Sequence, residues 1–131
     1  MLDEIALLRF NDVESVRRLL THHAPRLATV VLDPMPSRGG LIALNPRFLA
    51  AVQKTARDNG ILVNADEVTN LRQSFRCASA RYRLVPNLLS MGKIIGGGLL
   101  IGPIEGRNDV MEVFDASVGR PLLPQRSHFF R

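Results

Sequence analysis

Hydrophobic residues recur with the period of a helix in the first part of the chain. Within residues 11–23, one helical face carries apolar side chains and the arginines lie outside it. These apolar residues are Val13, Val16, Leu19 and Leu20. Asn11 followed by Glu14 resembles a capping box and predicts the start of a helix, which should end near His23 because Pro25 follows.

A second helix is predicted after Asn45-Pro46, because asparagine is a good N-cap and proline suits the first helical turn. The left-handed preference of Asn59-Gly60 predicts its end. The expected inward face consists of Phe48, Leu49, Val52 and Ala56. A further helix is expected over residues 108–114.

Four short apolar runs predict strands, at residues 28–32, 61–66, 88–91 and 99–104. The runs do not alternate with polar residues, which favours parallel strands covered on both faces. The polar, arginine-rich residues 69–82 predict a loop with about one helical turn, and residues 115–131 an irregular tail. This order of elements predicts an α/β fold with a mostly parallel sheet.

The composition indicates one globular domain. The chain has 131 residues, 46% hydrophobic and 22% charged, which does not suggest disorder. Its formal charge is +5, but the arginines are scattered and there is no tryptophan, so nucleic-acid binding is not expected.

Cysteine usage and hydropathy bear on the compartment. The single cysteine, Cys77, fits a reducing environment, and metal-ligand spacing is absent, so we expect no metal site. No apolar run approaches membrane-spanning length, and acids at Asp3 and Glu4 do not fit a signal peptide. We therefore expect a cytoplasmic location and no membrane partner.

An acid and an amine are predicted at one edge of this sheet. Asp66 and Lys93 follow neighbouring strands, and ligands collect at the carboxyl ends of parallel strands. Lys93 is one of two lysines, stands next to glycine and apolar residues, and as an amine could form a Schiff base with an aldehyde. Alternatively, Lys93 extends its ammonium group into solvent or pairs with Asp66, and Asp66 caps a turn or pairs with an arginine such as Arg72.

Two glycine-containing motifs are excluded by their spacing. A P-loop needs serine or threonine after the lysine and a glycine five residues before it, but Ile94 and Leu88 occupy those positions. No G-x-S-x-G nucleophile motif occurs either.

The segments ILVNADEV at residues 61–68 and VPNLLSMGKIIGGGL at residues 85–99 resemble class III aminotransferases. Within that family they are most similar to the glutamate-1-semialdehyde 2,1-aminomutase branch. Residues 30–60 match the strand, proline loop and helix of the same pattern in order. The resemblance implies part of the three-layer α/β/α large domain of the fold-type-I transferases, with pyridoxal 5'-phosphate as cofactor.

The resemblance also implies roles for individual residues. Lys93 would be the catalytic residue that forms the Schiff base and then moves protons. Asp66 would hold the pyridine nitrogen protonated, and Val68 would pack against one face of the ring. Glu67 matches the pattern, but its side chain should point the other way along the strand, so no chemistry is assigned to it. The substrate would be an amino acid or amino aldehyde.

The chain departs from the family pattern at several positions. Asp33-Pro34 replaces the common Glu-Pro, the turn at residues 69–72 is one residue shorter, and Asn87 replaces an aspartate. Ser127 and His128 stand where the family has a glycine and a threonine that reaches a neighbouring subunit.

The phosphate-binding turn, the ring-stacking aromatic residue and the small domain of the family have no counterpart in residues 1–131. We therefore expect an incomplete large-domain segment that binds cofactor weakly in isolation and associates as a homodimer or with the missing segments. The alternative is a non-catalytic fragment or interaction module of the same fold.

Overall fold

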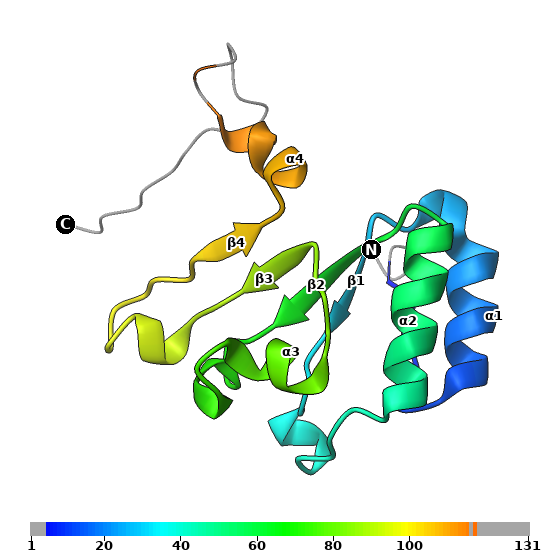
Figure 1. Cartoon of the computed structure of the whole chain (residues 1–131), viewed down its shortest axis with the longest axis horizontal. Coiled ribbons are helices and arrows are strands. Elements are labelled where there is room, and N and C mark those ends of the chain that lie inside the picture. Colours follow the sequence, from blue (N-terminus) through cyan, green and yellow to red (C-terminus); the bar gives the residue numbers. More distant parts are fainter. Residues whose placement is uncertain (1–4, 116, 118–131) are drawn as a thin grey trace.

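The computed structural model describes residues 5–115 and residue 117, and it has a four-stranded sheet in the order β1-β2-β3-β4. The strands are β1 (Thr29–Leu32), β2 (Leu62–Asp66), β3 (Leu88–Ser90) and β4 (Ile104–Gly106). The helices are α1 (Val13–His23), α2 (Pro46–Asp58), α3 (Cys77–Tyr82) and α4 (Asn108–Met111). Strands β1, β2 and β3 are parallel and β4 runs antiparallel to β3 (Figure 1). The predicted mixed α/β fold with a mostly parallel sheet is confirmed.

Helix α1 begins one residue later than its sequence pattern predicts. Asp12, rather than Asn11, is the N-cap, and its carboxylate accepts a hydrogen bond from the backbone N–H of Ser15. Asn11 has a positive φ of 61° and its side chain binds the 43–45 segment instead, donating to the Ala43 carbonyl and accepting from the Asn45 N–H. The asparagine thus joins the starts of α1 and α2.

Both predicted ends of α2 are confirmed. The Asn45 side chain accepts a hydrogen bond of 2.8 Å from the N–H of Arg47, and Pro46 occupies the first helical position. At the other end, Gly60 adopts a φ of 68°, which is costly for any residue with a Cβ atom. All four residues of the predicted inward face are buried.

The core lies between the sheet and the helix pair α1–α2, which stand side by side in Figure 1. Its buried members include Val16 and Leu20 of α1, Phe48, Leu49, Val52 and Ala56 of α2, and Val30, Leu32, Val63 and Ala65 of the sheet. Burial in β1 alternates strictly, and Val31, which faces away from the helices, is 59% exposed. The predicted cover on both faces is therefore absent over β1 among the described residues.

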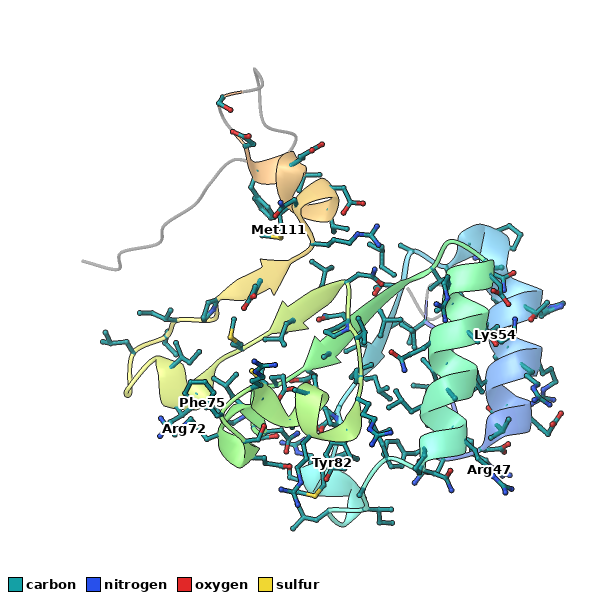
Figure 2. All side chains as sticks on the ribbon, viewed as in Figure 1. Arg47, Lys54, Arg72, Phe75, Tyr82 and Met111 are labelled. Carbon is teal, nitrogen blue, oxygen red and sulfur yellow. The ribbon has the colours of Figure 1, made fainter. Side chains whose placement is uncertain are left out.

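The segment between β2 and β3 has more helix than its composition indicates. A short 3-10 turn at Leu71–Gln73 is followed by the six-residue helix α3. Phe75, between these two elements, is fully exposed, and it lies near Arg72 (Figure 2).

The predicted strand at 99–104 is wrong in all but its last residue, because β4 begins at Ile104. The preceding glycines, Gly97 and Gly98, have positive φ angles of 55° and 100°, so the chain turns there instead of extending. Leu100, in the irregular segment before β4, is 91% exposed.

The helix expected over residues 108–114 is present as α4 and a following 3-10 turn at Glu112–Phe114. Apart from residues 115 and 117, the expected irregular tail lies outside the described residues, as do Ser127 and His128. No helix in the described part of the chain has the length and hydrophobicity needed to cross a bilayer.

Candidate active site

The carboxyl ends of β1, β2 and β3 meet at one edge of the sheet. Asp66 is the last residue of β2 and lies opposite Ser90, the last residue of β3. Lys93 follows three residues after Ser90 and begins a 3-10 turn at Lys93–Ile95. The predicted acid and amine thus belong to the same edge of the sheet.

Asp66 is half-buried and its carboxylate is held locally. Its Oδ1 accepts a hydrogen bond of 3.0 Å from the backbone N–H of Val68. Within the described residues Asp66 forms no ion pair, so the possible pairing with Arg72 is not observed. Asp66 therefore caps the turn that follows β2, and its second carboxylate oxygen has no hydrogen-bond partner in the described part of the chain.

Lys93 has an unusual backbone conformation. Its φ of 48° falls in the left-handed region, which is uncommon for a residue with a side chain and often marks functional sites. The side chain is exposed, so the apolar surroundings expected from the sequence do not bury the amine among the described residues.

The glycines around Lys93 allow close approach of neighbouring groups. A Cβ atom on Gly92 would lie 3.4 Å from Cγ1 of Val68, so a side chain at this position would pack directly against the valine. A Cβ atom on Gly96 would lie 2.4 Å from the carbonyl oxygen of Leu99, which leaves room only for glycine. The structure thus brings Val68 next to the residue that precedes Lys93.

Glu67, to which the sequence assigned no chemistry, is fully buried. Its carboxylate accepts hydrogen bonds from the N–H of Ala78 at 3.2 Å, the N–H of Ser79 at 2.5 Å, and the Ser79 hydroxyl. Its backbone N–H donates to the carbonyl of Ser90 at 2.8 Å. Glu67 therefore connects β2, β3 and α3, and its predicted orientation opposite to Asp66 agrees with the burial pattern.

Asp33, which follows β1, is a further acid at this edge that sequence reasoning noted only as a departure from the family pattern. Its Oδ1 accepts hydrogen bonds from the N–H of Met35 at 2.9 Å and from Nδ2 of Asn70 at 2.6 Å. Burial raises the pKa of Asp33 above its usual value. The nearby charges of Asp66 and Glu67 raise this pKa further, and the two hydrogen bonds oppose the increase. The sequence contains a signal for Asp33, because an acid directly after a buried strand lies where ligands collect in parallel sheets.

Comparison with known proteins agrees with the fold. Residues 4–120 match the family model described as "Aminotransferase class-III". A glutamate-1-semialdehyde 2,1-aminomutase from Prosthecochloris aestuarii is 37% identical over 105 residues, which are 79% of this chain and 24% of the relative.

Solved structures give the same result. An omega-transaminase from Sphaerobacter thermophilus superposes with a TM-score of 0.92 and 38% identity, over 95% of this chain and 28% of that one. A transaminase solved with PLP bound superposes with a TM-score of 0.86 and 35% identity, over 91% of this chain and 28% of that one.

This chain therefore spans about a quarter of the length of the relatives it matches. The family match covers most of the chain. The chain belongs to the class III aminotransferase family.

Proposed function

We propose that this chain forms part of a pyridoxal-phosphate-dependent aminotransferase or aminomutase in which Lys93 and Asp66 carry the chemistry. The observation that supports this most is the register of β2 and β3, because Asp66 lies opposite Ser90 at the strand ends that precede Lys93. In open α/β sheets this is the edge at which ligands bind.

The described residues fit this cofactor. A pyridine ring with a protonated nitrogen needs a carboxylate acceptor, and the cofactor's aldehyde needs a primary amine. Asp66 has a carboxylate oxygen without a partner among the described residues, and Lys93 has an exposed amine. When bound, pyridoxal phosphate would act as an electron sink that stabilises negative charge on a substrate carbon.

Asp66 would accept a hydrogen bond from the ring nitrogen and keep the proton on that nitrogen. The hydrogen bond from the Val68 N–H orients the carboxylate for this purpose. Because a carboxylate favours the charged form of a cationic partner, its removal would weaken protonation of the ring.

Lys93 would hold the cofactor through Nζ and, once released, carry a proton at that same atom between substrate and cofactor. The left-handed backbone conformation of Lys93 supports this role, because such conformations often mark functional sites. Val68, which lies beside Gly92, would form an apolar wall against one face of the ring.

The proposed substrate class is an amino acid or amino aldehyde, by analogy with the aminomutase and the transaminases that the chain resembles. Transamination and intramolecular amine transfer would both use Lys93 and Asp66. Association as a homodimer, or with further segments of the fold, fits the exposed apolar side chains of Val31, Phe75 and Leu100.

A cofactor titration tests this function. Pyridoxal phosphate is added to the wild-type chain and to Lys93→Ala and Lys54→Ala variants while the absorbance of the cofactor is followed. Lys54 is the other lysine, lies on α2 (Figure 2), and pairs with Asp58 at 2.5 Å, so it serves as a matched control. We expect a spectral change that disappears in Lys93→Ala alone. An equal change in both variants, or none at saturating cofactor, would favour a non-catalytic module of the same fold.

A further inference from the structure

The turn that follows Asp66 is joined to the end of β1 by a hydrogen bond between two side chains. Asn70 lies at the end of this turn and is only 3% exposed. Its Nδ2 donates a hydrogen bond of 2.6 Å to Oδ1 of Asp33, which is 37 residues away in the sequence. A hydrogen bond to a carboxylate is stronger than one between neutral groups.

The Asn70 side chain is satisfied at both of its polar atoms. Its Oδ1 accepts a hydrogen bond of 2.7 Å from Nε2 of Gln73, and its backbone N–H donates to the carbonyl of Glu67 at 3.2 Å. Asn70 therefore links the end of the turn to Glu67 and Gln73 nearby in the sequence. Through Asp33 it also links the turn to the end of β1.

Electrostatics make this amide important. Asp33, Asp66 and Glu67 lie close enough for their charges to interact, and none of them forms an ion pair within the described residues. The N–H groups of Asn70 and Met35 are the donors that face the Asp33 carboxylate. Without the Asn70 amide, the Asp33 carboxylate would lose one of the two hydrogen bonds that stabilise its charge near Asp66.

We propose that Asp33 and Asn70 form a positioning pair that holds the turn at residues 68–70, and with it the carboxylate of Asp66 at the end of β2, against the end of β1. This inference rests on the proposed function of Asp66 at the ring nitrogen. Asp33 and the turn that contains Asn70 are both departures from the family pattern, and here the two departures are in contact with each other.

A donor–acceptor exchange tests the pair. Asn70→Asp places two carboxylates against each other, whereas the double variant Asp33→Asn/Asn70→Asp reverses the hydrogen bond and keeps acceptors for Met35 and Gln73. The readout is amide hydrogen exchange at Val68 and Glu67, whose N–H groups bond to Asp66 and Ser90. We expect Asn70→Asp to increase exchange at neutral pH by about tenfold or more and the double variant to restore most of the protection.

The dependence on pH separates positioning by this pair from general loss of packing. The defect of Asn70→Asp should diminish as the pH is lowered, since protonation of one carboxyl restores a donor between the two groups. Asn59→Asp, the same chemical change at the end of α2, should leave exchange at Val68 unchanged, because the Asn59 side chain donates to the Thr55 carbonyl within its own helix.

Two results would overturn the inference: wild-type exchange at Val68 in Asn70→Asp, or no recovery in the double variant. If Asn70→Asp does not fold, Asn70→Ala takes its place and should also lose protection at Val68, while a folded double variant with wild-type exchange still supports the pair. The readout needs no cofactor. Failure of the proposed function would instead appear as an unchanged cofactor spectrum with the wild-type chain.

Discussion

Asp66 lies directly opposite Ser90 across the parallel pair β2–β3, and the backbone N–H of the next residue, Glu67, donates to the Ser90 carbonyl at 2.8 Å. This pairing places the last residues of β2 and β3 side by side. The acid of one strand and the lysine that follows the other therefore belong to the same edge of the sheet, and the predictions below concern the groups that hold this edge.

Removal of the Glu67 carboxylate should destabilise the fold strongly. Glu67→Ala leaves the N–H groups of Ala78 and Ser79 and the Ser79 hydroxyl buried without their acceptor. We expect a loss of about 3 kcal/mol in the free energy of unfolding, measured by urea denaturation. Ser79→Ala, which removes only the hydroxyl, should cost about 1 kcal/mol.

The control for Glu67 is Glu14→Ala. Glu14 is an exposed acid on α1 that pairs with Arg17 at 3.2 Å, and exposed pairs contribute less than about 1 kcal/mol. Equal losses for Glu14→Ala and Glu67→Ala would show that the buried network contributes little to stability.

Asp33 should make the protein less stable as the pH rises. Its pKa is raised in the folded state, first by burial and then by Asp66 and Glu67. Between the unfolded and folded pKa values the native state binds more protons than the unfolded state, so the contribution of Asp33 to stability falls with increasing pH.

Asp33→Asn removes this titration but keeps an oxygen acceptor for Met35 and Asn70. We expect the variant to be more stable than the wild type at pH 7 and to lose that advantage near pH 3, measured as the difference in Tm across the pH range. If the stability of the wild type relative to Asp33→Asn instead increased between pH 3 and pH 7, the pKa of Asp33 would not be raised.

The backbone at Lys93 should be strained. With a φ of 48°, any residue with a Cβ atom at this position costs about 1–2 kcal/mol relative to the right-handed region. Lys93→Gly should therefore be more stable than Lys93→Ala by about 1 kcal/mol, after allowance for the extra freedom of glycine in the unfolded chain. Urea denaturation of the two variants measures this, and the reverse order would show that the left-handed conformation is absent.

Capping residues and apolar runs predict those helix ends and strands that are determined by residues close in the sequence. The ends of α2 follow from Asn45, Pro46 and Gly60, and the first three strands follow from their apolar runs. The predicted strand at 99–104 is wrong in all but its last residue, because only Ile104–Gly106 pair with β3 and apolar content does not reveal this register.

The site is less predictable because its contacts are distant in the sequence. The alternation of β2 correctly predicts that Glu67 faces away from Asp66, but its partner Ser79 lies 12 residues further along and is not marked by any pattern. The hydrogen bond between Asp33 and Asn70 spans 37 residues, and it exists only because β1 and β2 are neighbours in the sheet.

The central claim is that the amine of Lys93 holds the cofactor, and covalent trapping tests it most directly. The chain is incubated with pyridoxal phosphate, reduced with borohydride, digested and analysed by mass spectrometry. We predict a pyridoxyl adduct on the peptide that contains Lys93. The amount of this adduct should be lower in Asp66→Asn and unchanged in Lys54→Ala. An adduct on Lys54 alone, or none on Lys93 at saturating cofactor, would contradict the claim.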